Sequence, residues 1–144
     1  MPSVRRLLPS DLPAWEGLFT GYCRFYRADV PDEVRRSTFE RLCAGDDLVG
    51  LVAVDEGDRP IGLMHLVFHP STWSSRIYCY IEDLYVEPAH RGGDVAKSLF
   101  DAGYALADER QADRTYWLTQ EFNAPARSLY DTVGHRTSFI VYAR

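Results

Sequence analysis

Long apolar runs are missing from this sequence of 144 residues. The longest, Leu48–Val54, contains Gly50 and ends at Asp55, far short of the roughly 20 residues that a membrane-spanning helix needs. The first residues also lack the apolar stretch of roughly 7 to 15 residues that marks a secretory signal. We therefore expect no membrane partner and a cytoplasmic location.

Cysteine and positive charge are also scarce. The three cysteines form neither a disulfide framework nor a CxxC pair, so we interpret Cys23, Cys43 and Cys79 as reduced structural residues. A formal net charge of -5 argues against a nucleic-acid partner, because binding to a phosphate backbone needs a basic patch. The histidines show no metal-ligand spacing with cysteine or acidic residues, which predicts that no metal is bound.

No repeat and no linker rich in proline, glycine or serine divides the chain. Apolar residues make up 46% of it and charged residues 26%, as in ordinary globular domains. A chain of this length can bury a core without metals or disulfides. We therefore predict one domain over residues 1–144.

The spacing of apolar residues predicts an α/β (α+β) fold. Strands are expected at residues 4–8, 48–54, 60–68, 76–86, 115–119 and 138–143. Helices are expected to start near Leu12, with Ser10 and Asp11 as the cap, at Pro31, after Pro88 and at Ala124. The turn at residues 56–58 favours an antiparallel hairpin, and the strand, helix and strand of residues 76–119 favour a parallel pair.

Residues 84–99 predict a strand end, a turn that contains glycine, and a helix. Small residues such as Gly92 and Gly93 let a backbone approach a ligand, and the free N–H groups of a first helical turn favour a phosphate. The segment therefore indicates an anion-binding turn. The alternative is a turn whose glycines serve backbone geometry alone.

The same segment resembles motif A of the GNAT superfamily of N-acetyltransferases, V-x-P-x-x-[RQ]-G-x-G-x-[GA] followed by an apolar helix. Asp94 stands in place of the second glycine, and the positions in register are Val86, Pro88, Arg91, Gly92, Ala96 and Leu99. A second stretch, residues 123–135, resembles motif B, N-x-x-A-x-x-L-Y-x-x-x-G-[FAH]. The resemblance extends over residues 4–144, including Arg5 and Asp11, and residues 81–86 and 117–119 look most like the small polyamine- and histone-type acetyltransferases.

This resemblance implies the GNAT fold, in which acetyl-CoA, the co-substrate, lies in an opening of the central sheet. The sheet is expected to be mixed and mostly antiparallel, with roughly six or seven strands, an opening between the fourth and fifth strands, and about four flanking helices. The residues expected to contact acetyl-CoA are Leu84, Tyr85, Val86, Arg91, Gly92, Gly93, Asp94, Val95, Ala96, Asn123 and Tyr130.

Two catalytic roles follow from the resemblance and from the chemistry of acetyl transfer. Tyr130 matches the family tyrosine that protonates the departing thiolate, unless it is a buried core tyrosine. Glu82 is expected to accept a proton from the attacking ammonium, if it shares a strand face with Leu84 and is not simply an acid at a sheet edge. A bulge in this strand would exchange the places of Glu82 and Asp83. Asn123 either bonds the cofactor arm or caps a helix.

The acceptor side is expected to involve Tyr26, Glu82 and Asp83. An acidic mouth lined by aromatic residues would suit a cation, whereas the same aromatics are also good core residues. The residues that could form it are Tyr22, Phe25, Tyr26, Asp29, Asp32, Glu33 and Trp73.

These observations favour an acetyl-CoA-dependent N-acetyltransferase that transfers the acetyl group directly to a primary amine, on a small polycation, a peptide or a lysine side chain. Two alternatives stay open: a non-catalytic module that binds or senses acyl-CoA, suggested by Asp94, and a small α/β interaction domain without a ligand. The resemblance also implies that two copies can pair as a homodimer.

Overall fold

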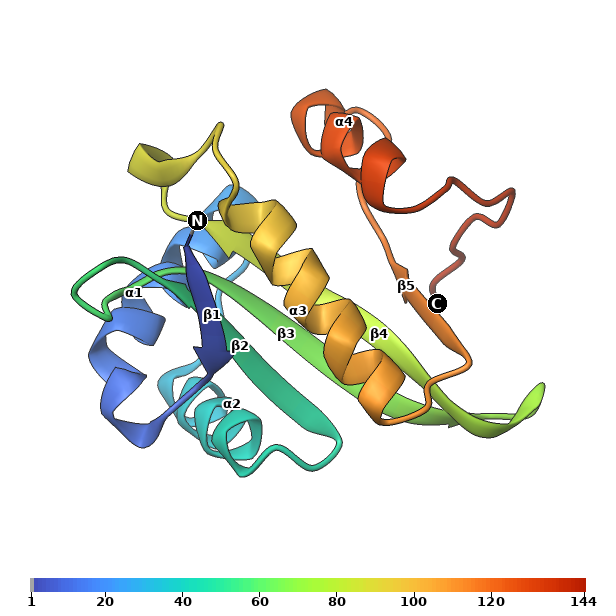
Figure 1. The fold of residues 1–144 in the computed structure, drawn as a ribbon, viewed down its shortest axis with the longest axis horizontal. Coiled ribbons are helices and arrows are strands. Elements are labelled where there is room, and N and C mark those ends of the chain that lie inside the picture. The colour runs from blue at the N-terminus through green and yellow to red at the C-terminus, as the bar shows by residue number, and fades with distance from the viewer. Residues whose placement is uncertain (1) are drawn as a thin grey trace.

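A five-stranded sheet forms the centre of the computed structural model, which describes residues 2–144 (Figure 1). The strands lie in chain order, with bounds β1 Ser3–Arg6, β2 Leu48–Val54, β3 Pro60–Ser71, β4 Ser74–Val86 and β5 Arg114–Trp117. Neighbouring strands pair antiparallel, except for β4 and β5, which pair parallel. The predicted hairpin and the predicted parallel pair are confirmed.

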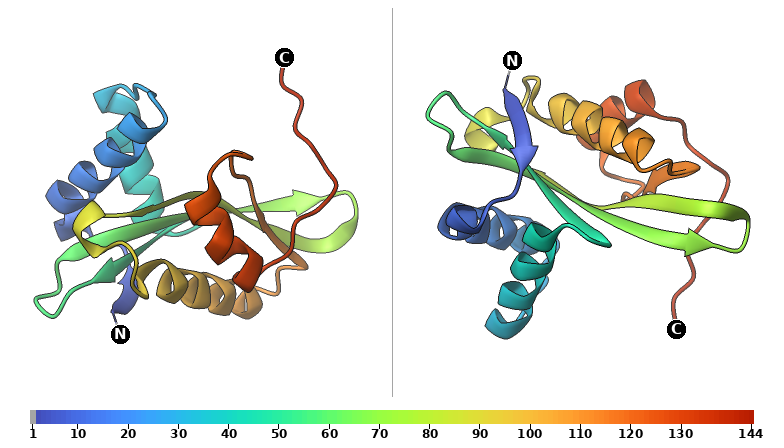
Figure 2. Two further views of the ribbon diagram at one scale, coloured as in Figure 1. Left: turned by 90° about the horizontal axis from the view of Figure 1, so that it is seen from above. Right: turned by 60° about the horizontal axis from the view of Figure 1, so that its bottom comes forward.

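Four α-helices flank this sheet, with bounds α1 Leu12–Phe25, α2 Asp32–Ala44, α3 Val95–Glu109 and α4 Ala124–Val133. Figure 2 shows α1 and α2 on one face of the sheet and α3 and α4 on the other. The expected α+β class and number of helices are confirmed. Within residues 2–144 no helix is long and apolar enough to cross a membrane.

Helices on both faces give the sheet two apolar cores. Successive side chains of a strand point to opposite faces, so Leu51 of β2 packs in the core with Phe100 of α3, and Val52 packs in the core with Trp15 of α1. Because β2 is buried on both faces, its sequence is apolar throughout. Each fully buried Leu or Val stabilises the fold by about 1.5–3 kcal/mol.

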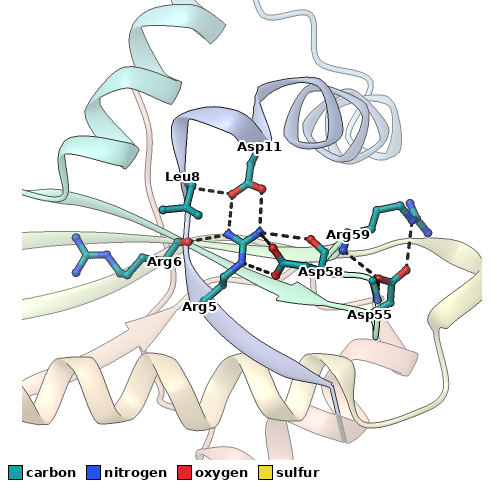
Figure 3. A network of polar contacts seen from close by, with 8 residues as sticks. Arg5, Arg6, Leu8, Asp11, Asp55, Asp58 and Arg59 are labelled. Carbon is teal, nitrogen blue, oxygen red and sulfur yellow. Dashed lines mark hydrogen bonds and ion pairs between the residues drawn. The ribbon is translucent and has the colours of Figure 1, made fainter.

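Arg5 joins β1 to the start of α1 and to the turn between β2 and β3 (Figure 3). Its guanidinium donates to both carboxylate oxygens of Asp11, at 2.8 and 2.9 Å, and to the Asp58 carboxylate at 2.9 Å. The buried Asp11 also accepts from the Leu8 N–H at 2.8 Å. The expected side-chain cap is therefore wrong: Asp11 precedes α1 but makes no capping hydrogen bond to it.

The predicted final strand at residues 138–143 is also wrong. This segment runs away from the sheet without pairing (Figure 2). Its apolar side chains are exposed, from 69% at Val141 to 89% at Tyr142. Such residues favour a strand only where a neighbouring edge accepts their backbone hydrogen bonds. The described chain therefore has five strands, fewer than the roughly six or seven expected.

Candidate active site

The sheet opens between β4 and β5. The two strands pair from Tyr78 with Arg114 to Ile81 with Trp117, and beyond this point β4 continues to Val86 while β5 ends. On its other side, the same part of β4 stays paired with β3. Within the described part of the chain, residues 82–86 therefore have no partner strand on the side of β5. The expected opening between the fourth and fifth strands is present.

A β-bulge lies in β4 at the start of this opening. Asp83 is the register partner of His65 and Ile81 is the partner of Leu66, so Glu82 is an extra residue without a partner on β3. The extra residue changes the alternation of side chains along the strand. Ile81 and Leu84 consequently both pack on the α3 side, while Asp83 turns to the α1 side.

A pocket lies in the opening, and residues in or next to β4, β5 and three helices line it. The lining consists of Tyr22, Tyr26, Ile81, Glu82, Leu84, Phe100, Trp117, Leu118 and Tyr130. Both predicted catalytic residues and the predicted substrate residue Tyr26 are therefore brought together. Their roles stay predictions.

Asp83, the other predicted substrate residue, does not line this pocket. Its carboxylate lies 2.8 Å from Nδ1 of the buried His65. The bulge does not exchange the places of Glu82 and Asp83, because Glu82 is itself the extra residue and still reaches the pocket.

Burial and charge change the acidity of the two predicted catalytic groups. Partial burial, and after it the neighbouring Asp83 carboxylate, raises the pKa of Glu82 above its ordinary value. Burial raises the pKa of Tyr130 to about 12. A raised carboxyl pKa makes Glu82 a better base, and a raised phenol pKa keeps Tyr130 protonated and able to donate.

Packing holds the Tyr130 ring while leaving its hydroxyl free. The ring meets Phe100 and Trp117 edge to face, with centroids 5.9 and 5.6 Å away. Among the described residues the hydroxyl has no hydrogen-bond partner. The ring of Tyr130 is thus packed as a core residue while the residue also lines the pocket, and its role as an acid stays a prediction.

The turn before α3 has the backbone geometry of an anion site. Gly92 has a φ of +84°, which favours glycine, and no atom lies within 4 Å of where a Cβ would stand at Gly92 or Gly93. The first N–H groups of α3 have no acceptor within the helix, and its dipole favours negative charge there. The predicted pyrophosphate contact at this turn stays a prediction, and Asp94 places an exposed carboxylate there that makes no capping hydrogen bond.

Other predicted cofactor residues are held by the protein itself. The Arg91 Nε donates to the Val86 carbonyl at 2.9 Å, and its guanidinium lies 5.2 Å from the Tyr85 ring centroid. The Tyr85 ring packs with the core on the α1 side, so only its backbone borders the opening. Asn123 stands at the N-cap position of α4 but makes no capping hydrogen bond, which leaves its side chain available.

Some residues that line the pocket were not predicted from the sequence, and several residues predicted for the acceptor side lie outside it. Phe100, Trp117 and Leu118 line the pocket, but their spacing marks them as ordinary core residues. The other residues that were expected on the acceptor side do not line the pocket; they are Phe25, Asp29, Asp32, Glu33 and Trp73. Within residues 2–144 no group of three or more His, Cys, Asp or Glu side chains could hold a metal.

Comparison with known proteins agrees with this geometry. The model of the acetyltransferase (GNAT) family matches residues 15–135. The D-amino-acid N-acetyltransferase HPA3 of Saccharomyces cerevisiae is 33% identical over 98% of this chain and 89% of its own length. The thialysine N-epsilon-acetyltransferase of Caenorhabditis elegans is 33% identical over 55% of this chain and 49% of its own.

The fold is shared with a solved structure. AAC(6')-Iy in complex with the bisubstrate analogue CoA-S-monomethyl-acetylneamine superposes with a TM-score of 0.87 at 19% identity, covering 100% of this chain and 97% of that one. Acetyl-CoA is the acetyl donor of the GNAT family. Since the family model spans most of the chain and the yeast relative nearly all of it, the chain belongs to the GNAT family of acetyltransferases and is an N-acetyltransferase.

Proposed function

We propose that this protein transfers an acetyl group directly from acetyl-CoA to a cationic primary amine. The observation that carries the proposal is the shared pocket: Glu82 from β4 and Tyr130 from α4 both line it where the sheet opens. A proton must leave the attacking amine and another must reach the departing thiolate. In this proposal Glu82 takes the first, directly or through water, and Tyr130 gives the second.

Acetyl-CoA, when bound, supplies the activated thioester, and the backbone of β4 supplies binding groups beside it. The Val86 carbonyl accepts from the Arg91 side chain, so it points away from β3. Because the N–H and C=O of one strand residue point to the same side, the Val86 N–H faces the opening, and so do those of Leu84. These groups can hold an extended arm and polarise a carbonyl.

The charge of the pocket supports a cationic acceptor. Its lining has one carboxylate, Glu82, and no Lys, Arg or His. The rings of Tyr22 and Tyr26 line the pocket with centroids 4.9 Å apart and are tilted by 57° to each other, and aromatic rings offer a cation the faces that it prefers. A carboxylate attached close to the reacting amine would meet no cation there. We therefore infer an acceptor amine remote from any carboxylate, as in a polyamine or a lysine side chain.

The names of the two relatives give two types of acceptor amine. The name of the yeast protein assigns it D-amino acids, whose amine is next to a carboxylate, and the name of the worm protein assigns it the side-chain amine of thialysine. The lining of the present pocket favours the second type.

A matched pair of acceptors tests this proposal. CoA thiol release is measured with 1,4-diaminobutane and with 4-aminobutanoate, which replaces one cationic end by a carboxylate, and then with a lysine amide and a D-amino acid. The diamine and the lysine amide should be the better substrates. Preference for 4-aminobutanoate or the D-amino acid would contradict the proposed acceptor. Calorimetric binding of acetyl-CoA without release for any amine would instead favour the acyl-CoA-sensing module.

We also propose that the protein forms a homodimer. Two features support this: within residues 2–144, β5 is an edge strand that pairs only with β4, and the apolar side chains of Phe139–Tyr142 are exposed. Light scattering on the purified protein should give twice the mass of 16.5 kDa, and a monomer mass at micromolar concentration would contradict it. The cytoplasmic location stays a prediction.

A further inference from the structure

A largely buried series of hydrogen bonds joins α1 to β4 through β3. The indole Nε1 of Trp15 donates to Nε2 of His65 at 3.0 Å, and Nδ1 of His65 lies 2.8 Å from the Asp83 carboxylate. Trp15 is fully buried and His65 is 3% exposed. Neither residue lines the pocket, so neither is used by the proposed mechanism.

The partners of His65 fix the role of each ring nitrogen. Because the indole N–H donates to Nε2, that nitrogen carries no proton, and the ring proton lies on Nδ1. Nδ1 then donates to Asp83. Both nitrogens are occupied by protein groups, so His65 is not available as a general base for the substrate.

These hydrogen bonds end at Asp83, the residue next to Glu82. His65 and Asp83 are register partners across β3 and β4, and the bulge lies between this pair and the pair of Leu66 with Ile81. The side-chain hydrogen bond therefore spans the strands at the point where Glu82 is inserted. It fixes the direction of Asp83, and with it the backbone that presents Glu82.

Two elements supply the ionisable groups near His65 and Asp83. From β4 the Asp83 carboxylate lies 2.8 Å from His65 and the Glu82 carboxylate interacts with both residues, and from α1 the Tyr22 phenol and the Cys23 thiol interact with Asp83. The hydrogen bond from His65 thus holds the Asp83 carboxylate in place beside Glu82. A neighbouring anion makes it harder for Glu82 to lose its proton and strengthens it as a base.

We propose that Trp15, His65 and Asp83 form a positioning relay, in which the Nδ1–H of His65 holds the Asp83 carboxylate so that Glu82 stays directed into the pocket as an effective base. This inference rests on the proposed function of Glu82. It makes Asp83 a positioning residue and not a contact of the substrate.

Two substitutions at His65 separate positioning from packing. In His65→Asn the amide nitrogen takes the place of Nδ1, so the hydrogen bond to Asp83 is kept and the one from Trp15 is lost. In His65→Gln the amide oxygen takes the place of Nε2, so the bond from Trp15 is kept and the donor to Asp83 is lost. Glutamine fills the site better, so a packing role predicts that His65→Asn is the more damaging change.

The relay predicts the opposite order. His65→Gln should lower kcat about tenfold or more below His65→Asn, since a small misplacement of a catalytic group has such effects, while acetyl-CoA affinity is the same in both variants. The midpoint of the fall in kcat at acidic pH should also shift in His65→Gln and stay unchanged in His65→Asn. Equal kcat values, or a lower kcat in His65→Asn, would overturn the proposal.

A spectroscopic measurement on the wild-type protein keeps the proposal testable if a variant fails to fold. Nitrogen-15 NMR at neutral pH, with the histidine rings assigned, should show the His65 ring protonated at Nδ1 alone; the same pattern is expected of His69, whose Nδ1 lies 2.8 Å from the Pro70 carbonyl oxygen, so the assignment of His65 is required. A proton at Nε2, or at both nitrogens, would overturn the relay. This result does not depend on turnover, so failure of the relay can be distinguished from failure of the proposed function, in which no amine releases CoA.

Discussion

Ile81 and Asp83 of β4 face opposite sides of the sheet, although only Glu82 separates them. Ile81 packs in the core with α3, and Asp83 is bonded to His65 on the α1 side. In a regular strand the two would share a face, and the bulge at Glu82 divides them. The same bulge brings Glu82 into the pocket with Tyr130.

Tyr130→Phe tests the proposed acid. The ring and its contacts with Phe100 and Trp117 are kept while the donor is lost. We expect kcat to fall about 100-fold or more, with acetyl-CoA affinity changed by less than about twofold, because only the transition state needs the proton.

Tyr104→Phe is the matched control for this variant. Its hydroxyl bonds the Val133 carbonyl at 2.5 Å, outside the pocket, so its loss should change thermal stability and leave kcat near the wild-type value. Parallel losses of kcat and acetyl-CoA affinity in Tyr130→Phe would show that Tyr130 serves packing alone. Since burial raises the pKa of Tyr130 to about 12, its ionisation should cause no loss of activity between neutral pH and pH of about 10.

Asp94→Gly tests the departure from the family turn. The Asp94 carboxylate is exposed at the start of α3 without a capping hydrogen bond, so it repels an anion there. We expect acetyl-CoA to bind about two- to fivefold more tightly at low salt, the effect of one charge at a helix N-terminus, and the gain to shrink at high salt.

Asp94→Asn removes the same charge without adding backbone freedom, and calorimetry should give it a similar gain in affinity. A gain in the glycine variant alone would assign the effect to backbone geometry. Unchanged dissociation constants in both variants would mean that Asp94 lies away from the bound anion.

Asp11→Asn tests the tie between β1 and α1. Hydrogen bonds from Arg5 hold the pKa of Asp11 below its ordinary value. The stabilisation is therefore present above about pH 3.9, the ordinary value, and is lost as the pH falls through the lowered pKa. The variant should lose about 1.5–3 kcal/mol of unfolding free energy at pH 7. Its unfolding free energy should also depend less on pH in the acidic range.

Asp101→Asn is the control for that measurement. Asp101 makes an exposed ion pair with Lys97 on α3, and exposed pairs contribute little. Denaturant titration at pH 7 should therefore separate the two variants clearly. Equal small losses would contradict a structural role for the Arg5 and Asp11 pair.

Local patterns in the sequence predicted most of the fold. β2 has the expected bounds, because burial on both faces gives it an unbroken apolar sequence. α4, which follows Asn123, also has the expected bounds, because the turn before it can be recognised in the sequence. Among the predicted strands, the one that failed was residues 138–143, whose strand propensity is high but whose pairing depends on an edge that no local pattern reveals.

The site was predictable in its residues and not in its geometry. Glu82 and Tyr130 could be named from spacing and resemblance, but the bulge that orients Glu82 is a property of the ladder between β3 and β4. The bond from Trp15 to His65 joins α1 to β3. A histidine inside an apolar strand gives no signal for such a partner.

The most direct test of the central claim is the pH dependence of kcat/KM for a diamine, in the wild type and in Glu82→Gln. Because burial and Asp83 raise the pKa of Glu82, wild-type activity should fall on acidification with a midpoint above the ordinary glutamate value of about 4.3. The variant should be about 100-fold slower and lack this limb, while both keep the separate limb that comes from the amine itself. Wild-type rates in Glu82→Gln, or an unchanged acidic limb, would contradict the account.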